Sequence, residues 1–219
     1  MSSATITTSA RLMNSTPQTE EQAMVRKVAV SSFLGNFIEW FDYASYSYFA
    51  TTIALVFFPT DNHTVAMLQT FGVFALSFIL RPIGALFWGS YGDKKGRKAA
   101  LAHSIMFMSG ASFLIGCLPS YSVIGVGAPI LLLLLRMVQG FSASGEYAGA
   151  ATFLGEYAPT SKRGIYCSLI PASTAIGLLA GSTLATLMTA NMNSSAMVGW
   201  GWRVPFLLAG PLGLIVLYI

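Results

Sequence analysis

Charged residues are scarce in this chain. Asp, Glu, Lys and Arg together make up 9% of the 219 residues, whereas soluble globular domains contain about 25%. Apolar residues make up 54%, against about 45–50% in soluble domains. A soluble domain of this length could not bury so many apolar side chains and still present a polar surface. The composition therefore predicts an integral membrane protein.

Residues that carry enzymatic or redox chemistry are also few. The two cysteines, Cys117 and Cys167, lie in apolar runs, so no disulfide framework is indicated. The two histidines, His63 and His103, are isolated from each other. The sequence has no nucleotide-binding loop, no His/Cys cluster with metal-ligand spacing and no Ser-His-Asp set. We therefore expect neither an enzyme, nor a metal site, nor a cofactor. The net charge of +4 lies in short segments rather than along a stripe, so a nucleic-acid partner is not expected.

Six apolar stretches dominate the rest of the chain. A membrane-spanning helix needs about 20 mainly apolar residues, and the candidates are residues 28–58, 65–91, 99–119, 128–157, 164–190 and 204–219. The expected fold is an all-α membrane unit over residues 26–219. Residues 1–25 are rich in Ser and Thr and lack the apolar core of a cleaved signal. We expect them to form a disordered cytoplasmic tail.

Basic residues are concentrated in alternate connections between these stretches. Nine precede the first stretch or follow the second or fourth: Arg11, Arg26, Lys27, Lys94, Lys95, Arg97, Lys98, Lys162 and Arg163. The connections on the opposite side contain only Arg203. Because cytoplasmic connections carry the excess of Lys and Arg, the pattern predicts a cytoplasmic N-terminus.

Five ionisable residues lie inside the spans: Glu39 and Asp42 in the first, Arg81 in the second, and Arg136 and Glu146 in the fourth. At about 1.5 Å of rise per residue, Glu39 and Arg81 reach a similar depth and are predicted to pair. Asp42 could pair with Arg136, although Arg136 lies in the outer half of its span. Three carboxylates face two guanidiniums, so either Glu146 or Asp42 is expected to lack a full-time partner.

A buried charge of this kind costs roughly 2.5–3.5 kcal/mol at a helix centre, so each needs a partner or a watery cavity. Burial favours the neutral form of a carboxyl group that lacks a cation, and such a group suits a proton carrier. The alternative is a static network that holds the helices together. Arginine keeps its proton at physiological pH, so the two arginines are expected to tune the acids or to bind anions. The five residues together are the predicted substrate and proton pathway.

Glycines recur at short intervals in two of the spans. They are Gly140, Gly145 and Gly149 in the fourth span, and Gly177 and Gly181 in the fifth. Small residues four apart let helix backbones approach closely. These five glycines are therefore predicted to be packing positions, which say little about the substrate.

The connection between the second and third spans reads Gly89-Ser-Tyr-Gly-Asp93-Lys-Lys-Gly96-Arg97-Lys98. This spacing resembles the loop between the second and third helices of the major facilitator superfamily. Glycines at 89, 92 and 96 are expected to permit a sharp reversal, and Asp93 to accept a hydrogen bond from Arg97 or from a helix N-terminus. The resemblance implies a cytoplasmic gating loop made by Gly89, Asp93, Gly96, Arg97 and Lys98.

Further segments resemble the metabolite–proton symporter branch of that superfamily, especially proline/betaine carriers. They are residues 35–42, 81–84, 136–147, 156–159, 162–164 and 199–206. The resemblance implies import of a small osmolyte or organic acid by proton symport in the bacterial inner membrane. The alternatives are a dicarboxylate or tricarboxylate symporter and, from another class, a truncated or regulatory half-carrier that does not transport. Ser144 and Tyr91 depart mildly from the family pattern.

Such carriers have two six-helix halves, with the substrate site between them near the bilayer midplane. The chain resembles the N-terminal half alone. The resemblance therefore implies a C-terminal six-helix half as a partner. Either the chain is a fragment or it assembles with another half, and the sequence leaves both possibilities open.

Overall fold

A computed structural model describes residues 16–218 of the chain, apart from the side chains of residues 16–23, 146–148, 153, 157 and 217. Within residues 16–218 the secondary structure is helical, without a strand. The helices are α2 (Thr16–Tyr48), α3 (Ala50–Phe57), α4 (His63–Ile79), α5 (Arg81–Lys95), α6 (Arg97–Cys117), α7 (Tyr121–Ile124), α8 (Gly127–Ala143), α9 (Glu146–Tyr157), α10 (Arg163–Asn191), α11 (Ser194–Ala196), the π-helix η1 (Met197–Gly201) and α12 (Arg203–Tyr218).

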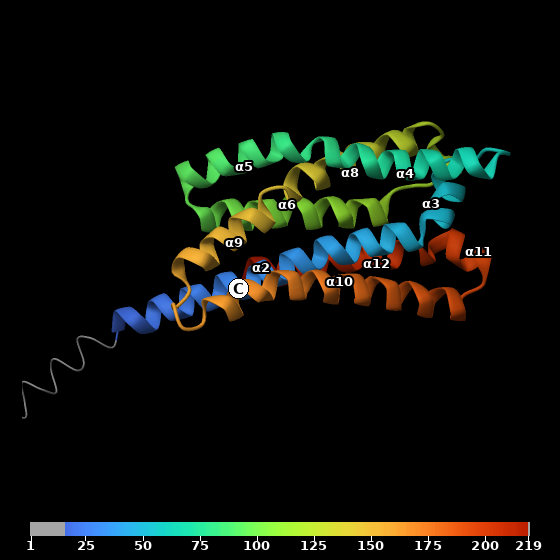
Figure 1. Cartoon of the computed structure of the whole chain (residues 1–219). Helices are drawn as coiled ribbons and strands as arrows, with labels where there is room; N and C mark the ends of the chain where they lie inside the picture. The colour runs from blue at the N-terminus through green and yellow to red at the C-terminus, as the bar shows by residue number, and fades with distance from the viewer. Residues whose placement is uncertain (1–15, 219) are drawn as a thin grey trace, which may run out of the picture.

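The helices join end to end into six rods that run side by side along one axis (Figure 1). The rods are α2 with α3, α4 with α5, α6, α8 with α9, α10, and α11 through η1 to α12. Helix α2 packs on α10, α6 packs on both α12 and α8, and α4 packs on α8. Among the described residues, four segments have the length and apolar composition to cross a membrane: His63–Lys95, Arg97–Cys117, Arg163–Asn191 and Ser194–Val216.

Two predicted boundaries differ from the structure. Helix α2 begins at Thr16, so residues 16–25 are helical although a disordered tail was expected; residues 1–15 lie outside the described part. Glu, Gln, Ala and Met in this segment are good helix formers, and low apolar content alone does not prevent a helix. The sixth rod begins at Ser194 instead of residue 204 because the Asn193 side chain accepts a hydrogen bond from the Ala196 N–H at 2.8 Å.

The reversal between the second and third rods is shorter than predicted. Helix α5 continues through Gly89 and Gly92 to Lys95, and only Gly96 leaves the helical conformation, at φ +93°. Glycine tolerates this left-handed region without the steric cost that a side chain would meet. The prediction that three glycines share the turn is therefore wrong for Gly89 and Gly92. Gly92 is instead buried against α6, where an added Cβ would lie 3.5 Å from the Cβ of Ala100.

The bundle core has two apolar clusters separated by a polar layer. Ile38 and Ala143 belong to one cluster, and Tyr46 and Leu132 to the other. Along α2 and α8 the residues between these positions include buried charged and amide side chains. The apolar clusters therefore exclude water on both sides of a central polar layer, and this raises the strength of the electrostatic interactions inside it.

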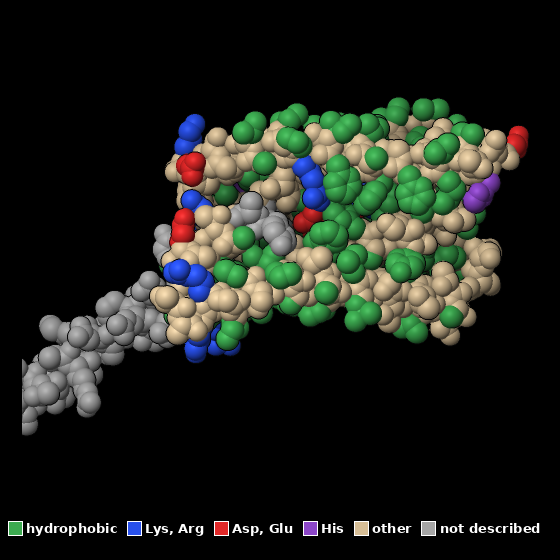
Figure 2. Space-filling model, viewed as in Figure 1, with side chains coloured by type: hydrophobic (Ala, Val, Ile, Leu, Met, Phe, Trp, Pro, Cys, Tyr) green, Lys and Arg blue, Asp and Glu red, His purple; other side chains and the backbone are tan. Residues whose placement is uncertain are grey.

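Basic side chains gather at one end of the bundle. Figure 1 shows the start of the described part of α2, the α5–α6 turn and the α9–α10 turn at the same end. Figure 2 shows Lys and Arg concentrated there, whereas apolar side chains cover the middle of this face. The segregation of bases in the sequence thus corresponds to one end of the structure. Which side of the membrane this end faces remains a prediction.

Candidate substrate and proton site

Helix α2 positions both acids of the first span. Glu39 and Asp42 are three residues apart, so they are neighbours on the helix surface, and each is 4% exposed. Glu39 forms an ion pair with Arg81 of α5, and Asp42 forms one with Arg136 of α8. Both predicted pairings are confirmed. The alternative that Asp42 is the acid without a partner is wrong.

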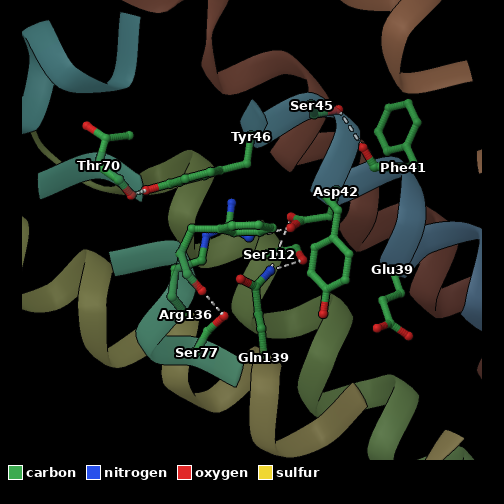
Figure 3. A network of polar contacts seen from close by, with 12 residues as sticks. Glu39, Phe41, Asp42, Ser45, Tyr46, Thr70, Ser77, Ser112, Arg136 and Gln139 are labelled. Carbon is green, nitrogen blue, oxygen red and sulfur yellow. Dashed lines mark hydrogen bonds and ion pairs between the residues drawn. The ribbon is translucent and has the colours of Figure 1, made fainter. Parts of the chain in front are cut away.

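Asp42 is the centre of a hydrogen-bonded group of four side chains (Figure 3). Nη1 of Arg136 donates to Asp42 Oδ2 at 2.5 Å, and Nε2 of Gln139 donates to Asp42 Oδ1 at 3.1 Å. The same Gln139 nitrogen donates to Oγ of Ser112 at 2.5 Å. The Asp42 carboxylate therefore joins α2 to α8, and the Gln139 amide links both of them to Ser112 of α6. In Figure 3 the Glu39 side chain points away from the group.

Aromatic rings complete the surroundings of Arg136. Its guanidinium carbon lies 3.9 Å from the centre of the Tyr46 ring and 5.5 Å from that of Phe206, so two ring faces are within range of cation–π attraction. The Tyr46 hydroxyl donates to the carbonyl oxygen of Thr70 at 2.9 Å. Arg136 is 1% exposed, and its Nε and Nη2 have no hydrogen-bond acceptor among the described residues. This ion pair is sealed from the surface.

The Glu39 pair is more open. Nη2 of Arg81 donates to Glu39 Oε1 and to the Tyr43 hydroxyl, and the Arg81 side chain is 30% exposed. The pair lines an open pocket of about 520 Å³ between α2, α5 and α8, together with Trp40, Pro82, Ala85, Ala143 and Ser144. A solute at the surface can therefore reach Arg81 but not Arg136.

Glu146 is the fifth predicted residue of the pathway, and its side chain lies outside the described residues. Its backbone is the first residue of α9, immediately after the interruption between α8 and α9 at Ser144 and Gly145. Both arginines of the layer are engaged by other carboxylates, Glu39 and Asp42.

Most of the predicted packing glycines lie where two helices approach closely. An added Cβ would lie within 3 Å of a neighbouring atom at Gly140, Gly145, Gly177 and Gly181. Gly149 is different: an added Cβ there would meet no atom of the described residues within 4 Å, and the residue lines a cavity. The packing prediction is wrong for Gly149. Sequence reasoning also missed Gly84, whose Cβ would lie 2.1 Å from the carbonyl oxygen of Phe141.

The predicted gating residues Gly89, Asp93, Arg97 and Lys98 line a separate cavity of about 240 Å³ between α5, α6 and the α8–α9 rod. Among the described side chains, Asp93 and Arg97 do not form the expected hydrogen bond. The two residues flank the turn on different helices, with Asp93 inside α5 and Arg97 at the start of α6. The gating role remains a prediction.

Asn36 is a buried polar residue that the sequence reasoning did not single out. Its Nδ2 donates to the Ile170 carbonyl oxygen at 3.0 Å and to the hydroxyls of Ser173 and Thr174, each at 2.8 Å. Its Oδ1 accepts a hydrogen bond from Trp40 Nε1 at 3.2 Å. Asn36 therefore joins α2 to α10 and orients an indole ring. The sequence feature that could have indicated this role is the presence of an amide side chain within an apolar span.

Comparison with known proteins identifies the family. Residues 27–219 match the family described as sugar (and other) transporter. The glycine betaine/proline/ectoine/pipecolic acid transporter OusA of Dickeya dadantii is 43% identical over 199 residues, which are 91% of this chain and 40% of the relative. The proline/betaine transporter of Escherichia coli K12 is 42% identical, with the same coverage. The chain thus spans about 40% of the length of these relatives.

Solved structures share the fold. The proton:xylose symporter XylE bound to 6-bromo-6-deoxy-D-glucose superposes with a TM-score of 0.77 at 16% identity, over 90% of this chain and 44% of that chain. The inward-open xylose transporter XylE from E. coli gives a TM-score of 0.74 at 16% identity, over 89% and 47%. The chain is a helical membrane protein, and it belongs to the sugar (and other) transporter family of the major facilitator superfamily.

Proposed function

We propose that this chain is the N-terminal half of a secondary transporter, or a half-sized transporter, that imports a small zwitterion such as proline or betaine together with a proton. The observation that carries the proposal is the partly exposed Glu39–Arg81 pair in an open pocket of the polar layer. Relatives at 42–43% identity that are named as proline/betaine transporters support it. The proposed location is the bacterial inner membrane, with the N-terminus in the cytoplasm.

The geometry favours a zwitterion over a dicarboxylate. Of the two polar-layer arginines, Arg81 and Arg136, a solute can reach Arg81. Glu39 already neutralises the charge of Arg81. A dicarboxylate would place two further negative charges beside Glu39 in a region of low dielectric constant, where like charges repel strongly. A zwitterion adds no net charge. The sealed Asp42–Arg136 pair is assigned to helix packing.

A second six-helix half is the proposed partner. The chain spans about 40% of its relatives, and both open pockets that contain Trp40 lie on the bundle surface. In the proposed assembly the second half covers these pockets and closes the substrate site between the halves.

Vesicles that contain the protein as its gene encodes it are expected to accumulate radiolabelled glycine betaine when an inward proton gradient is imposed. The measurement is uptake with the gradient, and uptake with the gradient collapsed by a protonophore. Empty vesicles provide the background. Absence of uptake above that background would refute transport and favour the alternative, a half-carrier without transport activity.

We further propose Glu146 as the acid that couples proton entry to transport, because Glu39 and Asp42 each hold an arginine. Glu146→Gln is expected to insert in normal amounts and to lose gradient-driven accumulation. Glu156→Gln, which changes an exposed acid on the same helix, is the matched control and should keep it. Gradient-driven accumulation that survives in Glu146→Gln would refute Glu146 as the coupling acid.

A further inference from the structure

We propose that four aromatic side chains beside Arg81 form a subsite for the ammonium end of the substrate, and that Arg81 binds its carboxylate end. The four residues, Trp40, Tyr43, Phe74 and Phe78, are called the aromatic wall below. The inference rests on the proposed function and adds a preference to it: the ligand class is a zwitterion whose ammonium group is methylated or otherwise weakly hydrated.

The aromatic wall is a continuous set of ring contacts. Trp40 meets Tyr43 edge to face at 5.7 Å between ring centres, Tyr43 meets Phe74 at 5.4 Å, and Phe74 meets Phe78 at 5.2 Å. These rings line an open pocket of about 620 Å³ between α2, α4 and α10. Trp40 also lines the pocket that contains Arg81 and Glu39. The two pockets therefore adjoin at one indole ring.

The Trp40 ring is fixed by a hydrogen bond to a buried side chain of the same helix. Its Nε1 donates to the buried Asn36 at 3.2 Å, and Asn36 is in turn fixed by three acceptors on α10. The polar edge of the indole is thus satisfied within the protein, while the half-buried ring contributes to both pockets. A ring fixed before binding loses little conformational entropy when a ligand arrives. Asn36 is a positioning residue for this subsite.

The carboxylate end of a ligand has donors available at Arg81. Both hydrogen bonds of Arg81 with described residues use Nη2, and the Arg81 side chain is 30% exposed. A guanidinium carries five N–H donors in a planar fork that matches a carboxylate. The Arg81 guanidinium carbon lies 4.6 Å from the Phe78 ring centre, so the wall also holds the fork that would meet the carboxylate.

The ammonium preference follows from the lining of the aromatic pocket. Besides the four rings, the described residues that line the pocket are Ala44, Ser47, Tyr48, Leu178, Leu179 and Ser182, and none of them carries a carboxylate. Once the proposed second half covers this pocket, a primary ammonium would exchange its water for a few hydroxyls, those of Ser47, Tyr48 and Ser182. A methylated ammonium has no such groups, and the negative faces of aromatic rings attract it, with Trp the strongest. Figure 2 shows a basic and an acidic side chain together near the middle of the long axis of the bundle, next to a surface of apolar side chains.

The test is equilibrium binding to the purified protein in lipid nanodiscs, measured by calorimetry with three probes. Glycine betaine has both ends, 3,3-dimethylbutanoate replaces the ammonium by an uncharged carbon group of the same shape, and choline lacks the carboxylate. Glycine betaine is expected to bind at least about tenfold more tightly than either analogue. Trp40→Ala should weaken glycine betaine binding about tenfold and 3,3-dimethylbutanoate binding less, because only the ammonium loses a cation–π contact, and Trp40→Phe should weaken glycine betaine binding less than Trp40→Ala does. Trp200→Ala, which changes an exposed indole in η1, is the control and should bind all three probes as the wild type does.

Equal affinity of the wild type for glycine betaine and 3,3-dimethylbutanoate overturns the subsite, and this comparison needs no variant to fold. Unchanged glycine betaine affinity in folded Trp40→Ala, checked by circular dichroism, overturns it as well. Uptake separates this inference from the proposed function. Selective binding without uptake supports the subsite and refutes transport, whereas uptake without selectivity for the ammonium supports transport and refutes the subsite. If the protein shows no binding and no uptake, both the subsite and the transport function are refuted.

Discussion

Asp42→Asn is expected to lower the free energy of unfolding by about 3–5 kcal/mol, the cost of leaving a buried charge without its partner. Arg136 is 1% exposed, and two of its nitrogens already lack acceptors among the described residues. The change removes the carboxylate that forms an ion pair with it. The measurement is the thermal unfolding midpoint in detergent, together with the amount of folded protein recovered from membranes.

The double variant Asp42→Asn with Arg136→Gln removes both charges and is expected to recover most of the lost stability, because an ion pair replaced on both sides leaves no uncompensated charge.

Glu39→Gln should also reduce the amount of folded protein, but less than Asp42→Asn does, since Arg81 is 30% exposed and can be solvated. Asp93→Asn, at an exposed acid, is the control and should change the free energy of unfolding by less than about 0.5 kcal/mol. Equal effects of Asp42→Asn and Asp93→Asn would contradict the sealed ion pair.

Gly140→Ala is expected to destabilise the bundle by about 2–3 kcal/mol, in the upper range for overpacking. The added Cβ would lie 1.9 Å from the carbonyl oxygen of Ser77. This atom belongs to the backbone of α4 and cannot move away as a flexible side chain could. Helices α4 and α8 must separate at their crossing, which loosens the helix that carries Arg136. The same thermal unfolding assay measures the effect.

Gly149→Ala is the matched control for this prediction. The two glycines lie on the same rod, but within the described part of the chain no atom lies within 4 Å of a Cβ at Gly149. Alanine is favoured over glycine in a helix interior by about 0.8–1 kcal/mol, so Gly149→Ala should leave stability unchanged or raise it slightly. If the two variants behaved alike, the close approach of α4 and α8 at Gly140 would not be the cause.

The spans and the ion pairs could be predicted because they depend on position along the chain. Hydropathy marks the apolar stretches, and the fixed rise of a helix converts a residue number into a depth. Glu39 and Arg81 were paired on depth alone, and the structure has the pair. The extent of α2 and of the sixth rod was underestimated, because hydropathy detects apolar stretches and misses polar residues with good helix propensity.

Hydropathy and depth do not predict how each helix is rotated about its own axis, and therefore which of its faces meets a neighbouring helix. The spacing of Gly145 and Gly149 could not distinguish a residue at a close helix approach from one that lines a cavity, and it gave no reason to select Gly84. The role of Asn36 depends on acceptors more than 130 residues away on α10. Such relations depend on which faces of distant helices meet.

The sequence by itself therefore determined a helical membrane protein with acids and arginines at matched depths, because burying apolar surface in lipid and satisfying charges there constrain every chain in the same way. The tertiary structure alone decided which of the two pairs is accessible. Apolar clusters and the rings of Tyr46 and Phe206 close around Arg136, whereas Arg81 lies at the edge of an open pocket beside Trp40. The physical reason is that exposure depends on packing between segments far apart in the chain, which depth and hydropathy do not specify.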